Sequence, residues 1–290
     1  MMPLWFILAA ASGACYALEG AWVKHLSSHG FKPGFLAWSA AFFILPVLWL
    51  LVLLQGLPEI KPEFYFPFAM TVVGNTAAIA CYFRALSYGQ LSMVYPLLAL
   101  TPVWMLLSTE LITGEFPGRL GLLGIFLSTA GCYALGVDRT GPLSPFRNLW
   151  GNPGSRWALI TSALWSLTAN FDKAAVEASS ALFHPAAVGV ALSITLFAVS
   201  PRECRDGFRR FATLGGFWRI MVLSLLVILL VVCQFTAFDL AQATYVTSVK
   251  RGGLIIGVLF GWLVYKEPYG PRRLLLSLFV LAGLLCLAFA

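Results

Sequence analysis

Long apolar runs, separated by short stretches rich in Gly, Pro and charge, extend over almost the whole chain. An α-helix needs about 20 apolar residues to cross a bilayer. The runs lie at residues 4–24, 35–54, 66–86, 91–112, 120–137, 157–176, 185–200, 219–240, 244–264 and 272–290. The pattern predicts an all-α polytopic membrane protein with ten transmembrane helices and no room for a soluble domain.

The composition supports this class. The chain has 290 residues, of which 60% are hydrophobic and 11% are charged, whereas soluble domains have roughly 45–50% apolar and about 25% charged residues. A water-soluble globular enzyme is therefore excluded. Disorder is excluded as well, because disordered chains are poor in aromatic residues and this chain is 14% aromatic. No charged segment precedes the first run, so we expect no cleaved signal peptide.

The formal net charge of +7 comes mainly from short loops between the runs. Most Lys and Arg residues follow the odd-numbered runs, and the opposite side holds only Lys61, Arg119 and Lys173. Because positive residues favour the cytoplasm, we expect both termini to lie outside. Since the basic residues are explained by this topology signal, we expect no nucleic acid to bind. Short loops and unpaired cysteines suit an integral protein of a bacterial inner membrane.

The two halves of the sequence resemble each other. The segments ALSYGQLS (85–92) and TGEFPG (113–118) recur 152 residues later as AFDLAQAT (237–244) and YKEPYG (265–270), and GACYALEGAWVK (13–24) aligns with SALWSLTANFDK (162–173). Five helices per repeat is an odd number, so the second repeat should be inverted, as in many secondary transporters that bind substrate near the midplane. We therefore expect repeats at 1–138 and 157–290, joined by a connecting loop at 139–156.

These features resemble the drug/metabolite transporter (DMT) superfamily, in particular its ten-helix EamA-domain type. The resemblance rests on the paired segments at 85–92 and 237–244 and on Glu115 and Glu267, each followed by a Gly-containing turn. It implies an inverted-repeat transporter that moves a small metabolite by alternating access. It leaves the substrate open among amino acids, sugars, nucleotide sugars, organophosphates and drugs. This sequence departs from the nucleotide-sugar branch in one respect. That branch keeps its termini in the cytosol, whereas the distribution of Lys and Arg here places both termini outside.

Lys250 and Arg251 are adjacent cations inside the run 244–264. Ionisable residues within a span are costly and mark functional pathways. Two neighbours on a helix point about 100° apart, so the pair can hold one anionic group from two directions. Similar cation pairs in the phosphate-translocator branch hold a substrate phosphate. The sequence thus favours an anionic solute, including phosphorylated ones. Alternatively, one cation pairs permanently with Asp172 or Asp239 and the other extends to the interface.

The position of each polar residue along its run gives a depth. At about 1.5 Å per residue, Lys250, Arg251, Asp172, Asn170 and Gln234 lie roughly 20 Å from the cytoplasmic end of their helices. Asn75 lies at about 16 Å and Glu19 at about 8 Å on the same scale. This arithmetic predicts Asp172, rather than Glu19, as the resting partner of the two cations.

Other side chains are weaker candidates. Asn75, Asn170 and Gln234 suit a pathway or interhelical hydrogen bonds equally well. Aromatic side chains are candidates for cavity walls, namely Tyr16, Tyr82, Tyr95 and Trp165. Glu19 is a candidate proton-coupling carboxylate or a partner of Lys24 or Arg84.

Besides the anion transporter, the sequence leaves two alternative functions open, and it gives no support to a third class, the membrane enzyme. A membrane enzyme lacks support, because His25 and His29 are not part of an HExxH motif, and the chain has no Walker A sequence. We expect no cofactor and no metal, and coupling to protons or to exchange. The alternative transporter exports amino acids, drugs or other neutral or cationic solutes, with Glu19 or Asp172 as the coupling acid. A membrane protein without transport activity is the second alternative.

Overall fold

A computed structural model describes residues 2–89, 91–113, 116–135, 137, 141, 151–253 and 270–290. These residues are almost entirely helical and contain no strand, so the all-α class is confirmed. The helices are α1 (Leu4–Ser28), α2 (Pro33–Phe42), α3 (Leu45–Gln55), the short 3₁₀ helix η1 (Pro62–Phe64), α4 (Tyr65–Tyr88), α5 (Leu91–Leu98), α6 (Thr101–Thr113), α7 (Arg119–Leu135), α9 (Pro153–Glu177), α10 (Phe183–Val199), α11 (Pro201–Phe211), α12 (Leu214–Leu240), α13 (Ala243–Gly252) and α15 (Gly270–Ala288).

Several helices are long and apolar enough to cross a membrane. In the described part of the chain four segments meet this test, Leu4–Ser28, Pro33–Gln55, Pro62–Tyr88 and Leu214–Leu240. The helices α10 and α11 would together form a fifth, although they are bent by 105°. The membrane class is supported, but the count of ten helices is not confirmed. The predicted run 244–264 begins as α13, and its part beyond Gly253 lies outside the described residues.

Two of the predicted helices are broken in the middle. The run 35–54 consists of α2 and α3, and the run 91–112 consists of α5 and α6. Pro46 and Pro102 are the second residues of α3 and α6, where the missing N–H of proline costs no helical hydrogen bond. Proline therefore places both breaks.

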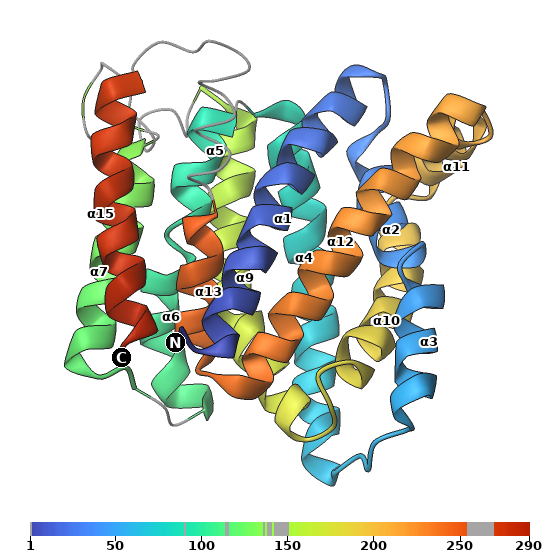
Figure 1. Cartoon of the computed structure of the whole chain (residues 1–290). Coiled ribbons are helices and arrows are strands. Elements are labelled where there is room, and N and C mark those ends of the chain that lie inside the picture. The colour runs from blue at the N-terminus through green and yellow to red at the C-terminus, as the bar shows by residue number, and fades with distance from the viewer. Residues whose placement is uncertain are drawn as a thin grey trace.

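The helices α1 and α9, which begin the two halves, run in opposite directions. At one face Lys24, near the end of α1, donates to the Gly89 carbonyl, and Gly89 also packs against Gly154 at the start of α9. At the other face Phe6, near the start of α1, shares a buried cluster with Val176 near the end of α9. Both termini lie at this second face (Figure 1).

The helix α11 was expected to be a loop. Its sequence PRECRDGFRRF is amphipathic, which is typical of a helix lying in the membrane interface. Gly207 packs against the ring of Phe35, and Cys204 is fully buried. The exposed side chains are mostly basic: Arg202, Arg205, Arg209 and Arg210.

Candidate functional site

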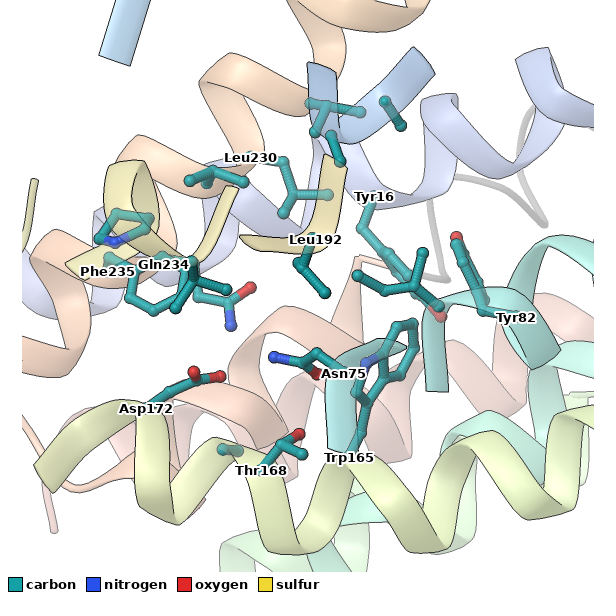
Figure 2. A pocket seen from close by; sticks show the side chains of 18 of the residues that line it. Tyr16, Asn75, Tyr82, Trp165, Thr168, Asp172, Leu192, Leu230, Gln234 and Phe235 are labelled. Atoms are coloured by element: carbon teal, nitrogen blue, oxygen red, sulfur yellow. The ribbon is translucent and has the colours of Figure 1, made fainter. Parts of the chain in front are cut away.

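A cavity of about 180 Å³ lies between the two halves of the molecule. Side chains from α1, α2, α4, α6, α9, α10, α12 and α13 line it. Its described ionisable lining residues are Glu19, Asp172, Lys250 and Arg251. Figure 2 shows Asp172 and Gln234 at one end, Asn75 in the middle, and Tyr16, Tyr82 and Trp165 at the other end.

Close contact between α1 and α13 positions the two cations. A Cβ atom on Gly13 would collide with the backbone of Lys250, and one on Gly253 would collide with the backbone of Gly13. Small residues permit such close helix packing. The contact holds the α13 backbone against α1 at the level of the cation pair.

Arg251 is the more enclosed cation of the pair, with only 4% of its surface exposed. Its Nη2 donates to Thr101 Oγ1 at 3.1 Å. Its guanidinium carbon lies 4.9 Å from the ring centre of Tyr16 and 5.1 Å from that of Trp165. Its Nε and Nη1 have no hydrogen-bond partner among the described residues. Two buried donors are thus left for another group.

Lys250 is bound to α12. Its ammonium donates a short hydrogen bond to Gln234 Oε1 and lies 5.0 Å from the centre of the Tyr16 ring. Tyr16 therefore contacts both cations through the face of its ring, where a cation is attracted. Gln234 takes the place that the sequence analysis gave to a carboxylate.

Asp172 does not form the predicted resting ion pair with either cation. Its Oδ1 lies 3.0 Å from Nε2 of His184, which is the second residue of α10 and is fully buried. The depth arithmetic ignored the direction of each side chain, and α10 packs on the side of α9 that carries Asp172. Asp239, the other predicted counter-ion, is exposed near the end of α12 and does not line the cavity.

Glu19 lines the same cavity as the two cations, although its position along its helix predicted that it would lie at a different depth in the membrane. It is 4% exposed, and its Oε2 accepts a hydrogen bond from the Tyr82 hydroxyl at 3.0 Å. The expected partners of Glu19 bind elsewhere. Lys24 donates to the carbonyls of Ser87 and Gly89, and Arg84 donates to that of Ala80.

The remaining predicted residues divide into two groups. Asn75, Tyr82, Trp165 and Gln234 line the cavity. Asn170 instead bonds to Ser108 and Thr109 on α6, and Tyr95 packs with its hydroxyl against Gly20. These two residues connect helices and do not face the cavity.

Sequence analysis missed His184 and Thr101 as site residues. His184 stands directly before the shortest predicted helix, where nothing in its spacing connects it to Asp172. Thr101 lies at the break between α5 and α6. The two prolines around that break were the one available signal for it.

Comparison with known proteins identifies the chain's relatives. No curated protein matches it in sequence. Several solved structures share its fold; for one of them, a crystal structure, the TM-score is 0.71 at 14% sequence identity, over 98% of this chain and 94% of the other. Residues 3–137 and 152–289 match the EamA-like transporter family. Since the match covers nearly the whole chain in two halves, the protein belongs to the EamA-like transporter family of membrane transporters, which is not an enzyme family.

Proposed function

We propose that this protein is a secondary-active transporter of a small organic anion, which Arg251 and Lys250 bind in the central cavity. The observation that carries the proposal is that Nε and Nη1 of Arg251 have no hydrogen-bond partner in the described part of the chain. Leaving a buried charged donor unpaired costs at least about 1–3 kcal/mol. A carboxylate, sulfonate or phosphate oxygen would supply a charge-assisted partner.

The opposite wall of the cavity favours an anion with an apolar body. The helix α2 contributes only alanine side chains there, Ile44 follows just before α3, and α10 and α12 contribute mostly aliphatic side chains. The described aliphatic residues of this wall include Ala37, Ala40, Ala41, Ile44, Val188, Leu192, Val227, Leu230 and Val231. Such walls do not satisfy the hydroxyl groups of a sugar. Phosphorylated compounds with an apolar body remain within the proposal.

Purified protein offers a direct test. A ligand that binds only the folded state raises the melting temperature. At a free ligand concentration one hundred times Kd, it adds about 2.7 kcal/mol to the free energy of unfolding. We expect benzoate, benzenesulfonate and phenyl phosphate to stabilise the protein and the double variant Lys250→Gln/Arg251→Gln to lose this effect. The matched control Arg205→Gln/Arg209→Gln neutralises two exposed arginines of α11 and should keep it. Stabilisation that survives in the cavity variant would overturn the proposal.

A second candidate is an exporter of neutral or cationic solutes. The observation that favours it is the presence of two carboxylates, Glu19 and Asp172, in the same cavity. It predicts that phenethylamine or tetraethylammonium stabilises the protein, and that Asp172→Asn or Glu19→Gln abolishes this stabilisation while the anions have no effect.

The orientation in the membrane is also part of the proposal. The basic face of α11 suits the cytoplasmic leaflet, where anionic lipids attract arginine. Both termini lie at the opposite face (Figure 1), so they would face outward, in a bacterial inner membrane. Reporter domains fused to the C-terminus, one active only outside and one only in the cytoplasm, test this orientation. Activity of the cytoplasmic reporter would contradict it.

A further inference from the structure

The charges in the cavity balance when it is empty. Among its described lining residues, Glu19 and Asp172 are acids, and Lys250 and Arg251 are bases. With all four ionised, their formal charges sum to zero. A bound monoanion would leave a net negative charge in a site enclosed by aliphatic walls. We propose that the cavity takes up one proton with each monoanion, on Asp172, so that transport is coupled to protons; this inference rests on the proposed anion site.

The physical reason is the cost of burying an unbalanced charge. Ions removed from water lose hydration, and a protein interior repays this only when opposite charges are close and hydrogen bonds are complete. Protonation of one cavity carboxylate restores the balance. Anion and proton therefore stabilise each other's binding, and this thermodynamic coupling must be reciprocal.

Asp172 is the carboxylate placed to accept that proton. Its Oδ1 is bound to His184, and no described residue forms a hydrogen bond with Oδ2. Figure 2 shows the carboxylate pointing toward the space between Gln234 and Asn75. A proton on Oδ2 would leave the His184 bond intact and provide a donor for an amide oxygen. Glu19 lies at the aromatic end, held by the Tyr82 hydroxyl.

His184 keeps the proton site on the aspartate. Its Nε2 is bound to Asp172, its Nδ1 has no partner in the described part of the chain, and its ring packs between those of Phe64 and Phe235. An imidazolium would bury a charged N–H at Nδ1 with no partner among the described residues, which is costly. The geometry therefore favours neutral imidazole with its hydrogen on Nε2. His184 acts as a positioning residue that holds Asp172.

The charged groups around Asp172 are few. The helix α1 contributes Glu19, α10 contributes His184, and α13 contributes Lys250 and Arg251. From α4 and α12 the facing polar side chains are the amides Asn75 and Gln234. The next residue of α9, Lys173, forms an ion pair with Glu177 at 2.7 Å. Asp172 thus shares the cavity with two cations and one other acid, and binds His184 directly.

Benzenesulfonate is the best probe, because it stays a monoanion at every relevant pH and cannot carry the proton itself. In weakly buffered solution, an indicator dye should report uptake of one proton per benzenesulfonate bound. The Kd should fall about tenfold for each unit decrease in pH where one proton is linked. This measurement uses the unaltered protein, so it does not depend on whether a variant folds.

Substitutions locate the proton. The variant Asp172→Asn should bind benzenesulfonate with no proton uptake, and at least tenfold more tightly at high pH, because its empty cavity carries an extra positive charge. Asp206→Asn, the same change at an exposed position of α11, should behave as the unaltered protein. The variant His184→Gln should shift the pH profile while keeping uptake of one proton.

The possible failures can be told apart. Binding without proton uptake overturns this inference and leaves the anion site standing. Proton uptake that persists in Asp172→Asn but disappears in Glu19→Gln moves the site to Glu19 and overturns the assignment. If benzenesulfonate, benzoate and phenyl phosphate fail to bind at any pH, the anion site and the proton coupling both fall.

Discussion

The first helices of the two halves, α1 and α9, carry aligned residues that make equivalent contacts. Tyr16 aligns with Trp165, and both rings lie against the Arg251 guanidinium. Lys24 aligns with Lys173, and each donates to a carbonyl at the end of the third long helix of its own half. Lys24 binds Gly89 after α4, and Lys173 binds Phe238 in α12. The framework of the two halves is alike.

The charges of the two halves differ. Lys250 and Arg251 of α13 align with Leu98 and Ala99, which are both fully buried apolar residues. Glu19 aligns with Thr168, and Asp172 aligns with Val23. A duplicated framework thus encloses a cavity whose chemistry comes from unmatched residues. Equal substitutions at matched positions should therefore have unequal effects, which can be measured.

The largest difference is expected at Gly13 and its counterpart Ser162. A Cβ on Gly13 would collide with the backbone of Lys250, whereas Ser162 already has a Cβ and bonds only to the Leu159 carbonyl within its own helix. Gly13→Ala should destabilise the protein by at least about 1–3 kcal/mol through overpacking. Ser162→Ala should cost less than about 1 kcal/mol. Melting temperatures in detergent compare the two, and equal losses would contradict the close contact of α1 with α13.

The next difference concerns the two rings beside the cations. Tyr16 contacts Lys250 and Arg251, whereas Trp165 contacts only Arg251 among the described cations. Cation–π contacts in desolvated sites contribute up to about 2 kcal/mol. We expect Tyr16→Leu to weaken benzenesulfonate binding about tenfold and Trp165→Leu about threefold. Isothermal titration measures both. A larger loss for Trp165→Leu would mean that this ring contacts the anion directly.

The sequence predicted the framework well because hydrophobic periodicity and duplication are properties of the chain itself. The apolar runs gave the all-α membrane class, and the paired segments at 85–92 and 237–244 gave the family. Prolines stand at 96 and 102, where they disfavour a continuous helix, and the helix is broken between them, at Ala99 and Leu100. The paired glutamates Glu115 and Glu267, by contrast, lie outside the described residues.

The partners within the site could not be predicted in this way. Depth along a helix gives one coordinate, whereas a contact also depends on the rotation of the helix and on its neighbours. Asp172 and Lys250 have similar depths but face different partners, His184 and Gln234. The amphipathic pattern of α11 is present in the sequence, but the segment is so rich in charged residues that it was interpreted as a loop. Its helical period places Cys204 and Gly207 on one buried face.

The matched lysines should differ less than the rings. Lys24 donates to the carbonyls of Ser87 and Gly89, at 3.3 and 2.6 Å, while Lys173 donates to the Phe238 carbonyl at 3.4 Å and pairs with Glu177. A cation at a helix C-terminus contributes about 0.3–1 kcal/mol. Lys24→Met should lower the free energy of unfolding by about this amount, and Lys173→Met by less, because the side chain of Glu177, the partner of Lys173, is 53% exposed and stays hydrated when the lysine is removed.

The two lysines lie at opposite faces, so they also test alternating access. If each lysine holds its own face closed, the Lys24→Met and Lys173→Met variants should open opposite faces. The rate at which cysteines are labelled from one side of the membrane should then rise in one variant and fall in the other. Labelling that changes in the same direction in both variants would mean that the lysines only stabilise helix ends.

The smallest effect is expected at α11, which has no counterpart in the first half. There the second and third long segments are joined by a short exposed stretch at residues 56–61. Arg210 donates to the His29 carbonyl at 3.2 Å in an exposed position, so Arg210→Ala should cost less than about 0.5 kcal/mol. Glu203→Ala should cost more, since Glu203 accepts from the part-buried Gly34 N–H at 2.6 Å. If Arg210→Ala proved the more damaging in urea or thermal unfolding, the exposed face of α11 would be a structural brace, and the two halves would differ in framework as well as in charge.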